Sequence, residues 1–402
     1  MYQKYYRQFL QAAQKAASED RSGDSFDTAE ASQGPLHMAC HSHHYWPDVT
    51  LDAVQQYWQD AARLADRKWD LIFGDKIPAF QRQIARNLNL PAPEQIAIAP
   101  NTHELVYRLL SAFDLSQPLR LLTTDGEFYS FARQLQRLEE LPNVEVVRIA
   151  TQPFDTLAER FEQALQSGQY DLAYASQVFF DSGVAFPGLL DIAARKPEAT
   201  QMVIDGYHGF FARPTDLSAI ADKVFYTAGS YKYLGAGEGM CFMSVPRGCQ
   251  LRPLNTGWFA EMAELENRSD NVGYGNDWLR FAGATMDYSA LYKALAVLEL
   301  FEKDGISVAS IHRYVQNNQR RFIAAMDAAE HPLLNRDNLI YHDLENGHGH
   351  FFTFRCGSAE NAEQLQQELL AKGILCDRRQ QLLRLGFAIY HPSDENFERL
   401  FT

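Results

Sequence analysis

The sequence has no long apolar run, no basic cluster and no closely spaced pair of cysteines. A membrane-spanning helix needs roughly 18 consecutive apolar residues, and glutamates interrupt even the apolar segment around Leu295–Phe301. Lys and Arg number 37 against 51 Asp and Glu, and the resulting net charge of −14 disfavours contact with nucleic acid or anionic membranes. Lys4 and Arg7 interrupt the N-terminal segment, where a signal peptide has a continuous apolar core. We therefore expect a cytoplasmic protein that binds neither membranes nor nucleic acid.

The cysteines and histidines do not form a clear metal-binding pattern. The five cysteines are odd in number and widely scattered: Cys40, Cys241, Cys249, Cys356 and Cys376. Their spacing predicts reduced thiols and argues against a cysteine-built zinc site. His37 and His41 have the H-x₃-H spacing of some metal sites, and His43 and His44 follow closely. Because no second ligand pair stands out elsewhere in the sequence, we expect no metal.

The pattern along the chain predicts an N-terminal arm followed by two α/β domains. Residues 1–17 have the apolar spacing of an amphipathic helix, and the polar residues up to 35 are expected to form an arm and linker. We expect a large domain over residues 36–288. Residues 289–402 are expected to form a long helix and a smaller C-terminal α/β domain.

Short apolar, β-branched segments alternate with helical segments through the large domain. Helical spacing covers residues 51–65 and 77–88. The expected strands lie within residues 96–100, 119–125, 144–150, 171–178, 201–205, 223–229 and 239–245. Such alternation indicates a mainly parallel sheet with helices on both faces. Ligands of such sheets bind beyond the carboxyl ends of the strands, so we sought functional residues directly after these segments.

Two residues in such positions suit the cofactor pyridoxal 5′-phosphate (PLP). Asp205 ends the predicted strand QMVID, where a carboxylate can cap the next turn or pair with a protonated pyridine nitrogen. Lys232 lies in the turn SYKYLGAGEG between two predicted strands. An isolated lysine is usually a solvated surface charge. The surrounding tyrosines and small residues instead suit a lysine that folds inward, and partial desolvation would lower its pKa enough for Schiff-base chemistry.

Two further positions agree with this interpretation. Asn101, Thr102 and His103 follow the first predicted strand at the start of a helix, where they can serve as a routine N-cap or present amides and hydroxyls to a phosphate. Phe128, in TTDGEFYS, again lies between a strand and a helix. Its side chain would belong to the core or would stack on the pyridine ring.

The order of these segments resembles the class V aminotransferase group of fold type I PLP enzymes, and most closely kynureninase. SYKYL matches the lysine turn, and Asp205-Gly-Tyr-His208 matches the motif D-x-x-H. NTGWF (255–259) and RFAGAT (280–285) match a G-W segment and R-F-x-x-G-T, and GILCDRRQQLLRLGFAIY (373–390) follows the C-terminal motif. The resemblance covers about residues 36–395. It implies a large domain with a mainly parallel seven-stranded sheet between helices, and a smaller C-terminal α/β domain.

The resemblance also implies roles for individual residues. Lys232 would carry PLP and transfer the Cα proton, and the adjacent Tyr231 would belong to the catalytic group. Asp205 would pair with the protonated ring nitrogen. Arg384 would bind the substrate carboxylate, and His41 and Ser42 would lie in the substrate loop. The other residues expected to contact the cofactor are Asn101, Thr102, Phe128, Tyr231, His208, Trp258 and Thr285. Trp258 and Thr285 would come from a neighbouring subunit, which implies a homodimer with shared active sites.

Two segments depart from the family pattern. The chain has CHSHHYWP (40–47) in place of a G-N-S-L-G-type substrate loop, so that His41 replaces Asn and the bulky His44, Tyr45 and Trp46 follow. Met286-Asp287 stands where the family has Pro-Pro. Both segments are expected to touch the substrate side chain, so they indicate a substrate pocket that differs from the family's.

Several functions remain open at this stage. The leading hypothesis is a kynureninase-like hydrolase that cleaves the Cβ–Cγ bond of a γ-keto amino acid and releases alanine. The alternative is a class V aminotransferase, or another PLP-dependent lyase that acts on a small amino acid. Cys356 could suggest a desulfurase nucleophile, although its context, FTFRCGSAE, favours a structural thiol at the end of a core strand. A non-catalytic cofactor-binding regulator is disfavoured, because the lysine, aspartate and arginine occur together.

Overall fold

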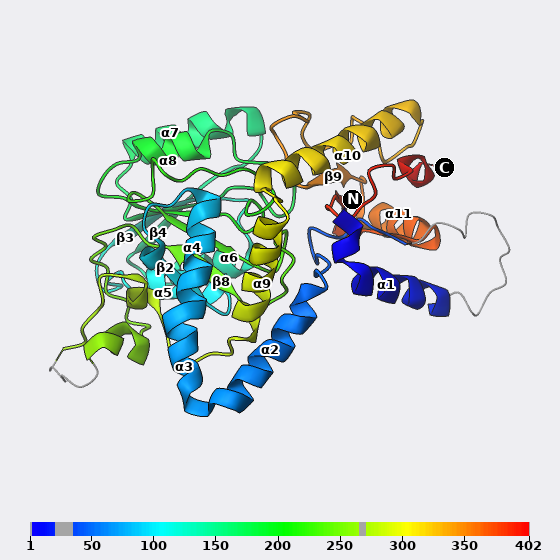
Figure 1. Cartoon of the computed structure of the whole chain (residues 1–402). Helices are drawn as coiled ribbons and strands as arrows, with labels where there is room; N and C mark the ends of the chain where they lie inside the picture. The colour runs from blue at the N-terminus through cyan, green and yellow to red at the C-terminus, as the bar shows by residue number, and fades with distance from the viewer. Residues whose placement is uncertain (1, 21–34, 265–270, 402) are drawn as a thin grey trace.

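A computed structural model describes residues 2–20, 35–264 and 271–401 (Figure 1). The large sheet has seven strands in the order β2-β8-β7-β6-β5-β3-β4. These strands are β2 (Ile96–Ala99), β3 (Leu119–Thr124), β4 (Val144–Ile149), β5 (Leu172–Ser176), β6 (Gln201–Asp205), β7 (Phe225–Gly229) and β8 (Cys241–Ser244). Only β8 runs antiparallel to its neighbours, and the other pairs in the sheet are parallel. The seven predicted strands and the mainly parallel sheet are therefore confirmed.

Alternate side chains of these strands enter two separate apolar clusters. One cluster joins Ile98 of β2 and Ile204 of β6 to helices α4, α7, α8 and α9, and the other joins Ala97 and Val203 to α5 and α6. β5 and β7 are buried along their whole length, as expected for central strands covered on both faces, and the edge strand β2 is buried as well. The sheet therefore lies between two helical layers.

The large unit contains α-helices on both faces of its sheet, and those predicted at residues 51–65 and 77–88 lie close to the predicted limits. Its helices are α2 (Val49–Leu64), α3 (Lys68–Leu71), α4 (Ile77–Leu88), α5 (Thr102–Leu110), α6 (Tyr129–Leu138), α7 (Leu157–Ser167), α8 (Leu189–Arg195) and α9 (Ser289–Lys303). α2 packs along α9, which leads toward the C-terminal unit (Figure 1). Within the described residues, no helix combines the length and apolarity that crossing a bilayer requires.

The C-terminal unit is built on a small antiparallel sheet. It contains α10 (Val308–Ala328), β9 (Phe351–Arg355), α11 (Ala359–Ala371), β10 (Ile374–Leu375), β11 (Asp377–Arg379) and β12 (Leu382–Gly386). β12 lies between β11 and β9, and both pairs are antiparallel. β1 (Leu36–His37) pairs with β10, so the chain that follows the predicted linker begins against the C-terminal unit. The exact domain limits remain a prediction.

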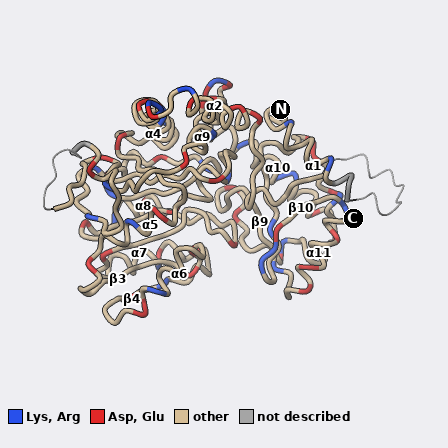
Figure 2. Tube along the Cα trace, turned by 90° about the horizontal axis from the view of Figure 1, so that it is seen from below, with Lys and Arg blue, Asp and Glu red and all other residues tan. Residues whose placement is uncertain are grey.

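The N-terminal segment packs against the rest of the chain. A short 3₁₀ turn (Tyr2–Tyr5) precedes α1 (Arg7–Asp20), which extends three residues beyond the predicted end of the helix at residue 17. Tyr6 is fully buried, and the amide of Asp48 donates to Tyr5 O at 2.7 Å. Most of the predicted linker, residues 21–34, lies outside the described residues. Figure 2 shows acidic and basic residues interspersed along both units.

Candidate functional site

Lys232 lies in a tight turn between the carboxyl end of β7 and the start of β8. Ser230 closes the turn, because its hydroxyl donates to Gly237 O at 2.8 Å and its carbonyl accepts from Ala236 N. Gly237 has φ +73°, and a Cβ atom there would lie within 2.8 Å of the Lys293 amine and the Trp46 ring. Only glycine fits this position, which explains the small residues behind the lysine.

The Lys232 amine points into the interior between the two units. Its Nζ donates to His41 O at 2.7 Å and lies 5.3 Å from the centre of the Tyr231 ring and 6.0 Å from that of Tyr207. Burial lowers the pKa of Lys232 from 10.5 to about 7, and the charges of Arg384 and Arg379 act in the same direction. The amine therefore has a substantial neutral fraction at neutral pH.

Asp205 ends β6 and is held by two donors. The Tyr174 hydroxyl donates to Oδ2 at 2.7 Å, and the Tyr207 amide donates to Oδ1 at 2.9 Å. Burial raises the pKa of Asp205, whereas these two bonds and the positive charge of Lys232 oppose the shift. Each carboxylate oxygen can accept another hydrogen bond, so Asp205 can still receive an N–H from a ligand.

Glu127 is a second buried carboxyl group that the sequence analysis missed. Its oxygens accept from the Thr124 and Ser176 hydroxyls, each at 2.6 Å. Ser176 pairs with Asp205 across β5 and β6, so Glu127, in the turn after β3, contacts the residue that lies beside Asp205 in the sheet. Burial raises the pKa of Glu127 to about 8, and the charge of Asp205 adds to this shift. The sequence signal that could have pointed to Glu127 was its place in the turn after the predicted strand over residues 119–125.

Three residues predicted to contact the cofactor line one narrow pocket: Thr102, Phe128 and Asp205. Phe128 precedes α6, is 41% exposed and lies edge-on to Phe180 at a centroid distance of 5.2 Å. Asn101 caps α5 by accepting from the Glu104 amide at 2.8 Å. Its side-chain oxygen therefore has the structural role that the sequence left open, while Thr102 faces the pocket.

His208 lies among the Lys232 neighbours. Its ring is buried 6.2 Å from the Tyr233 ring and 5.5 Å from the Phe351 ring. Burial, with the nearby Lys232 charge, lowers the pKa of His208 well below its usual value. Its Nδ1 has no hydrogen-bond partner in the described part of the chain. An unpaired buried nitrogen of this kind can bind a polar ligand group.

Arg384 is fully buried and already paired. It forms an ion pair with Asp377 and donates to Phe180 O and, at 3.4 Å, to Ser42 Oγ. The Ser42 hydroxyl also donates to Asp377, and His41 Nε2 lies 3.6 Å from the same carboxylate. Burial lowers the pKa of His41 to about 3, so its ring is neutral. The structure thus brings all three predicted substrate-binding residues together, with Asp377 at the centre.

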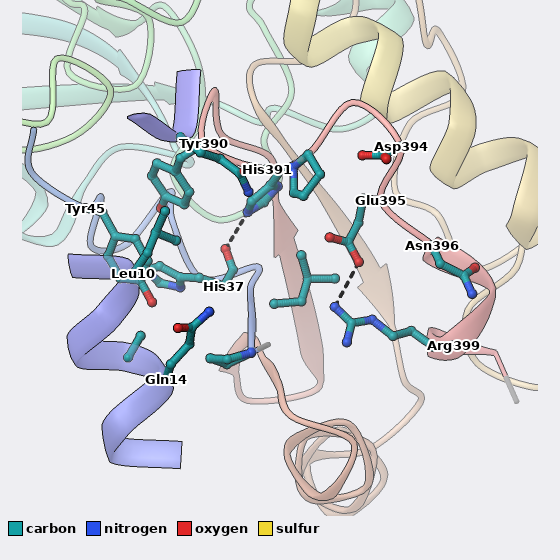
Figure 3. A pocket seen from close by; sticks show the side chains of 15 residues that line it. Leu10, Gln14, His37, Tyr45, Tyr390, His391, Asp394, Glu395, Asn396 and Arg399 are labelled. Atoms are coloured by element: carbon teal, nitrogen blue, oxygen red, sulfur yellow. Dashed lines mark hydrogen bonds and ion pairs between the residues drawn. The ribbon is translucent and has the colours of Figure 1, made fainter. Parts of the chain in front are cut away.

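The bulky residues after Ser42 turn away from this cluster. Tyr45 stacks on Tyr390 at 4.8 Å and lines a different pocket, of about 420 Å³, between α1 and the C-terminal segment (Figure 3). His44 is buried beside Tyr390, and the Trp46 ring lies 4.4 Å from the Lys293 amine. These three side chains pack against Tyr6 and Phe9 of the N-terminal segment, and the expectation that they reshape the substrate pocket remains a prediction.

Trp258 and Thr285 lie apart from the Lys232 cluster. Both side chains are exposed, and the segments that carry them meet where the Phe259 amide donates to Gly283 O at 3.3 Å. Within the described residues, no hydrogen bond or ring contact joins either side chain to Lys232 or Asp205. A contribution to the site from the neighbouring subunit remains a prediction.

All five cysteines are described and are free thiols. Burial raises the pKa of each thiol, including Cys356, which follows β9 and is 1% exposed. None of the five thiols therefore has the lowered pKa of an activated nucleophile. In the part of the chain that the structure describes, no three His, Cys, Asp or Glu side chains are arranged to hold a metal.

The chain has no match among family models or among curated proteins. Several solved structures match over most of its length. A variant of C-DES with glycine covalently linked to its PLP cofactor has a TM-score of 0.76 at 16% identity, covering 91% of this chain and 94% of that one. The complex of the cystine C–S lyase C-DES with its product cysteine persulfide has a TM-score of 0.74 at 16% identity, covering 91% and 95%.

An apo cysteine desulfurase from Thermococcus onnurineus NA1 also matches, with a TM-score of 0.72 at 16% identity over 89% of this chain and 90% of that one. These likenesses confirm the predicted α/β fold with its mainly parallel seven-stranded sheet. The part of the sequence resemblance that is specific to kynureninase finds no support in these comparisons.

Proposed function

We propose that this chain binds PLP through Lys232 and acts as a lyase on a small amino acid. The observation that carries the proposal is the buried Lys232 amine, whose pKa is lowered to about 7 and which lies in a turn at the end of β7. The matched structures support it, because two of them are a PLP-linked C-DES and the lyase C-DES with its product.

The residues present fit the cofactor. Asp205 retains acceptor capacity for a pyridine N–H, and Phe128 and Thr102 line the same pocket. The first turn of α5 offers backbone amides for a phosphate. The unpaired Nδ1 of buried His208 offers a further polar contact near Lys232. When bound, PLP supplies an electron sink that acidifies the Cα–H bond of an attached amino acid.

Lys232 is the residue suited to proton transfer at Cα. A base works best when its pKa lies near the working pH, and the Lys232 amine meets that condition at about 7. His41 O fixes the direction of the amine through its 2.7 Å hydrogen bond. Asp205, held by Tyr174 and Tyr207, supplies a carboxylate aligned for the ring nitrogen.

The thiols favour a lyase over a desulfurase that forms a persulfide on its own cysteine. Such a desulfurase needs a thiolate nucleophile in an accessible site. Here Cys40, Cys241 and Cys356 are buried, and burial raises the pKa of all five thiols. A lyase needs no such thiolate, because the lysine base would remove the Cα proton and the substituent at Cβ would leave with its bonding electron pair, with PLP as the electron sink.

A panel of amino acids tests the proposal. PLP-loaded protein should release pyruvate and ammonia from a β-substituted amino acid such as cysteine, cystine or β-chloroalanine without any keto acid present. Lys232→Ala should abolish release, while the exposed Lys223→Ala should not. A requirement for a keto acid would instead show a transaminase, and neither activity across the panel would contradict the proposal.

Kynureninase-like hydrolysis is a second candidate, supported by the SYKYL turn and the C-terminal motif around Arg384. Release of alanine from kynurenine, with no pyruvate, would identify it. A cytoplasmic location and a homodimer in which Trp258 and Thr285 complete the neighbouring site are part of the same proposal.

A further inference from the structure

The small antiparallel sheet presents three charged residues to the large domain. Asp377 and Arg379 lie on the same face of β11, and Arg384 of β12 is the register partner of Asp377. Arg378 points to the opposite face, where it contacts Gln366 and Glu363 of α11. One arginine of the neighbouring pair thus faces the site, and the other faces away from it.

Arg384 is committed to contacts within the protein. Asp377, Phe180 O and Ser42 Oγ take up its two terminal nitrogens, and the side chain is only 1% exposed. A substrate carboxylate could reach these donors only by displacing Asp377. That carboxylate also accepts a hydrogen bond from the Ser42 hydroxyl. Removing one member of a buried ion pair from its partner costs several kcal/mol in typical proteins.

Arg379 has no such partner. Within the described residues, no carboxylate lies within ion-pair distance of its guanidinium, whereas Arg384 has Asp377. The buried Nε of each of the two arginines makes no hydrogen bond, so the difference lies in the terminal nitrogens. The group lies over the rings of Tyr129 and Phe180, 5.4 Å from each centroid. Ring faces hold a guanidinium without using its N–H donors. The donors of the two terminal nitrogens are therefore free to bind a planar anion such as a carboxylate.

Arg379 is also close to the reactive lysine. Its charge contributes to the lowered pKa of both Lys232 and His208. Phe180, one of the two rings beneath it, lies edge-on to the ring of Phe128, which lines the narrow pocket with Thr102 and Asp205. The unpaired cation therefore lies beside the candidate cofactor site.

We propose that Arg379 binds the carboxylate of the substrate, while Arg384 stays paired with Asp377 and positions the segment that carries His41 and Ser42. This inference rests on the proposed function, because it assumes an amino-acid substrate. It departs from the sequence resemblance, which gives carboxylate binding to Arg384.

Binding of propionate and of its neutral isostere propionamide tests the proposal without turnover. Calorimetry on the PLP-incubated protein should show at least a tenfold preference for propionate. Arg379→Gln should reduce that preference to about twofold or less, and Arg379→Lys should restore part of it, because an ammonium keeps the charge but loses the fork. Arg378→Gln is the matched control, which removes the adjacent arginine on the other face, and should keep the full preference.

Two results would overturn the proposal: a propionate preference that survives Arg379→Gln, or no preference in the unmodified protein. The first result would place the carboxylate elsewhere in the site. Failure of the proposed function can be told apart from failure of this inference. If PLP does not attach to Lys232, the proposed function fails, but the Arg379-dependent preference for propionate over propionamide would remain.

Discussion

Replacing Lys232 by methionine should stabilise the cofactor-free protein, and more so at pH 7 than at pH 9. The pKa of Lys232 falls from 10.5 to about 7 on folding, so between these values the unfolded chain binds more protons than the folded one. The stability of the unmodified protein therefore rises with pH across this window. Below pH 7 the folded state carries the full cost of the desolvated charged amine.

The size of the effect follows from the same shift. With 1.36 kcal/mol per pKa unit, the lysine costs about 4 kcal/mol at pH 7 and about 2 kcal/mol at pH 9. Methionine removes this cost but loses the hydrogen bond to His41 O, which contributes about 1 kcal/mol. We expect Lys232→Met to gain about 3 kcal/mol at pH 7 and about 1 kcal/mol at pH 9.

Urea unfolding at the two pH values measures the gain. Lys223→Met is the control, because Lys223 is exposed in the loop before β7 and donates to Ala194 O at 2.8 Å. The control should lack the pH-dependent gain. Equal gains at both pH values for Lys232→Met, or a loss at pH 7, would show that the amine is not desolvated and would refute the reasoning.

Three other changes have defined outcomes. Asp205→Asn should lower the lyase rate by several orders of magnitude through loss of the ring-nitrogen contact; a change within about tenfold, or 1.4 kcal/mol, would leave Asp205 a structural role. Asp377→Asn should lower the free energy of unfolding by about 3 to 5 kcal/mol, because it leaves Arg384 buried without its counter-charge. An unchanged midpoint of urea unfolding would argue against the buried pair. Sedimentation equilibrium of the PLP-loaded protein should show a dimer. The double variant Trp258→Ala, Thr285→Ala should form a weaker dimer or lose the cofactor. A PLP-loaded monomer at micromolar concentration would contradict the shared site.

The large sheet could be predicted from the sequence because its strands are short apolar segments separated by helical spacing. The strands β6 (QMVID) and β3 (LRLLTT) are largely buried on both faces of the sheet. Strands of this kind appear in a sequence as nearly continuous apolar segments. The position of Lys232 followed from the glycines behind it, since Gly237 is required where Trp46 and Lys293 approach the backbone. Local signals of this kind are visible in one segment of the chain.

Features that depend on distant segments could not be predicted. The Arg384–Asp377 pair requires the register of β11 on β12, and the outward turn of Tyr45 depends on packing against Tyr390. The contact of β1 with β10 joins residues at opposite ends of the sequence. Glu127 escaped notice because its neighbours Ser176 and Asp205 come from other strands.

Attachment of the cofactor to Lys232 is the central claim, and borohydride reduction tests it most directly. Protein incubated with PLP, reduced and digested should yield one pyridoxyl-modified peptide, which contains Lys232, and Lys232→Ala should yield none. Modification of another lysine, modification that persists in Lys232→Ala, or no modified peptide from the unmodified protein would contradict the account.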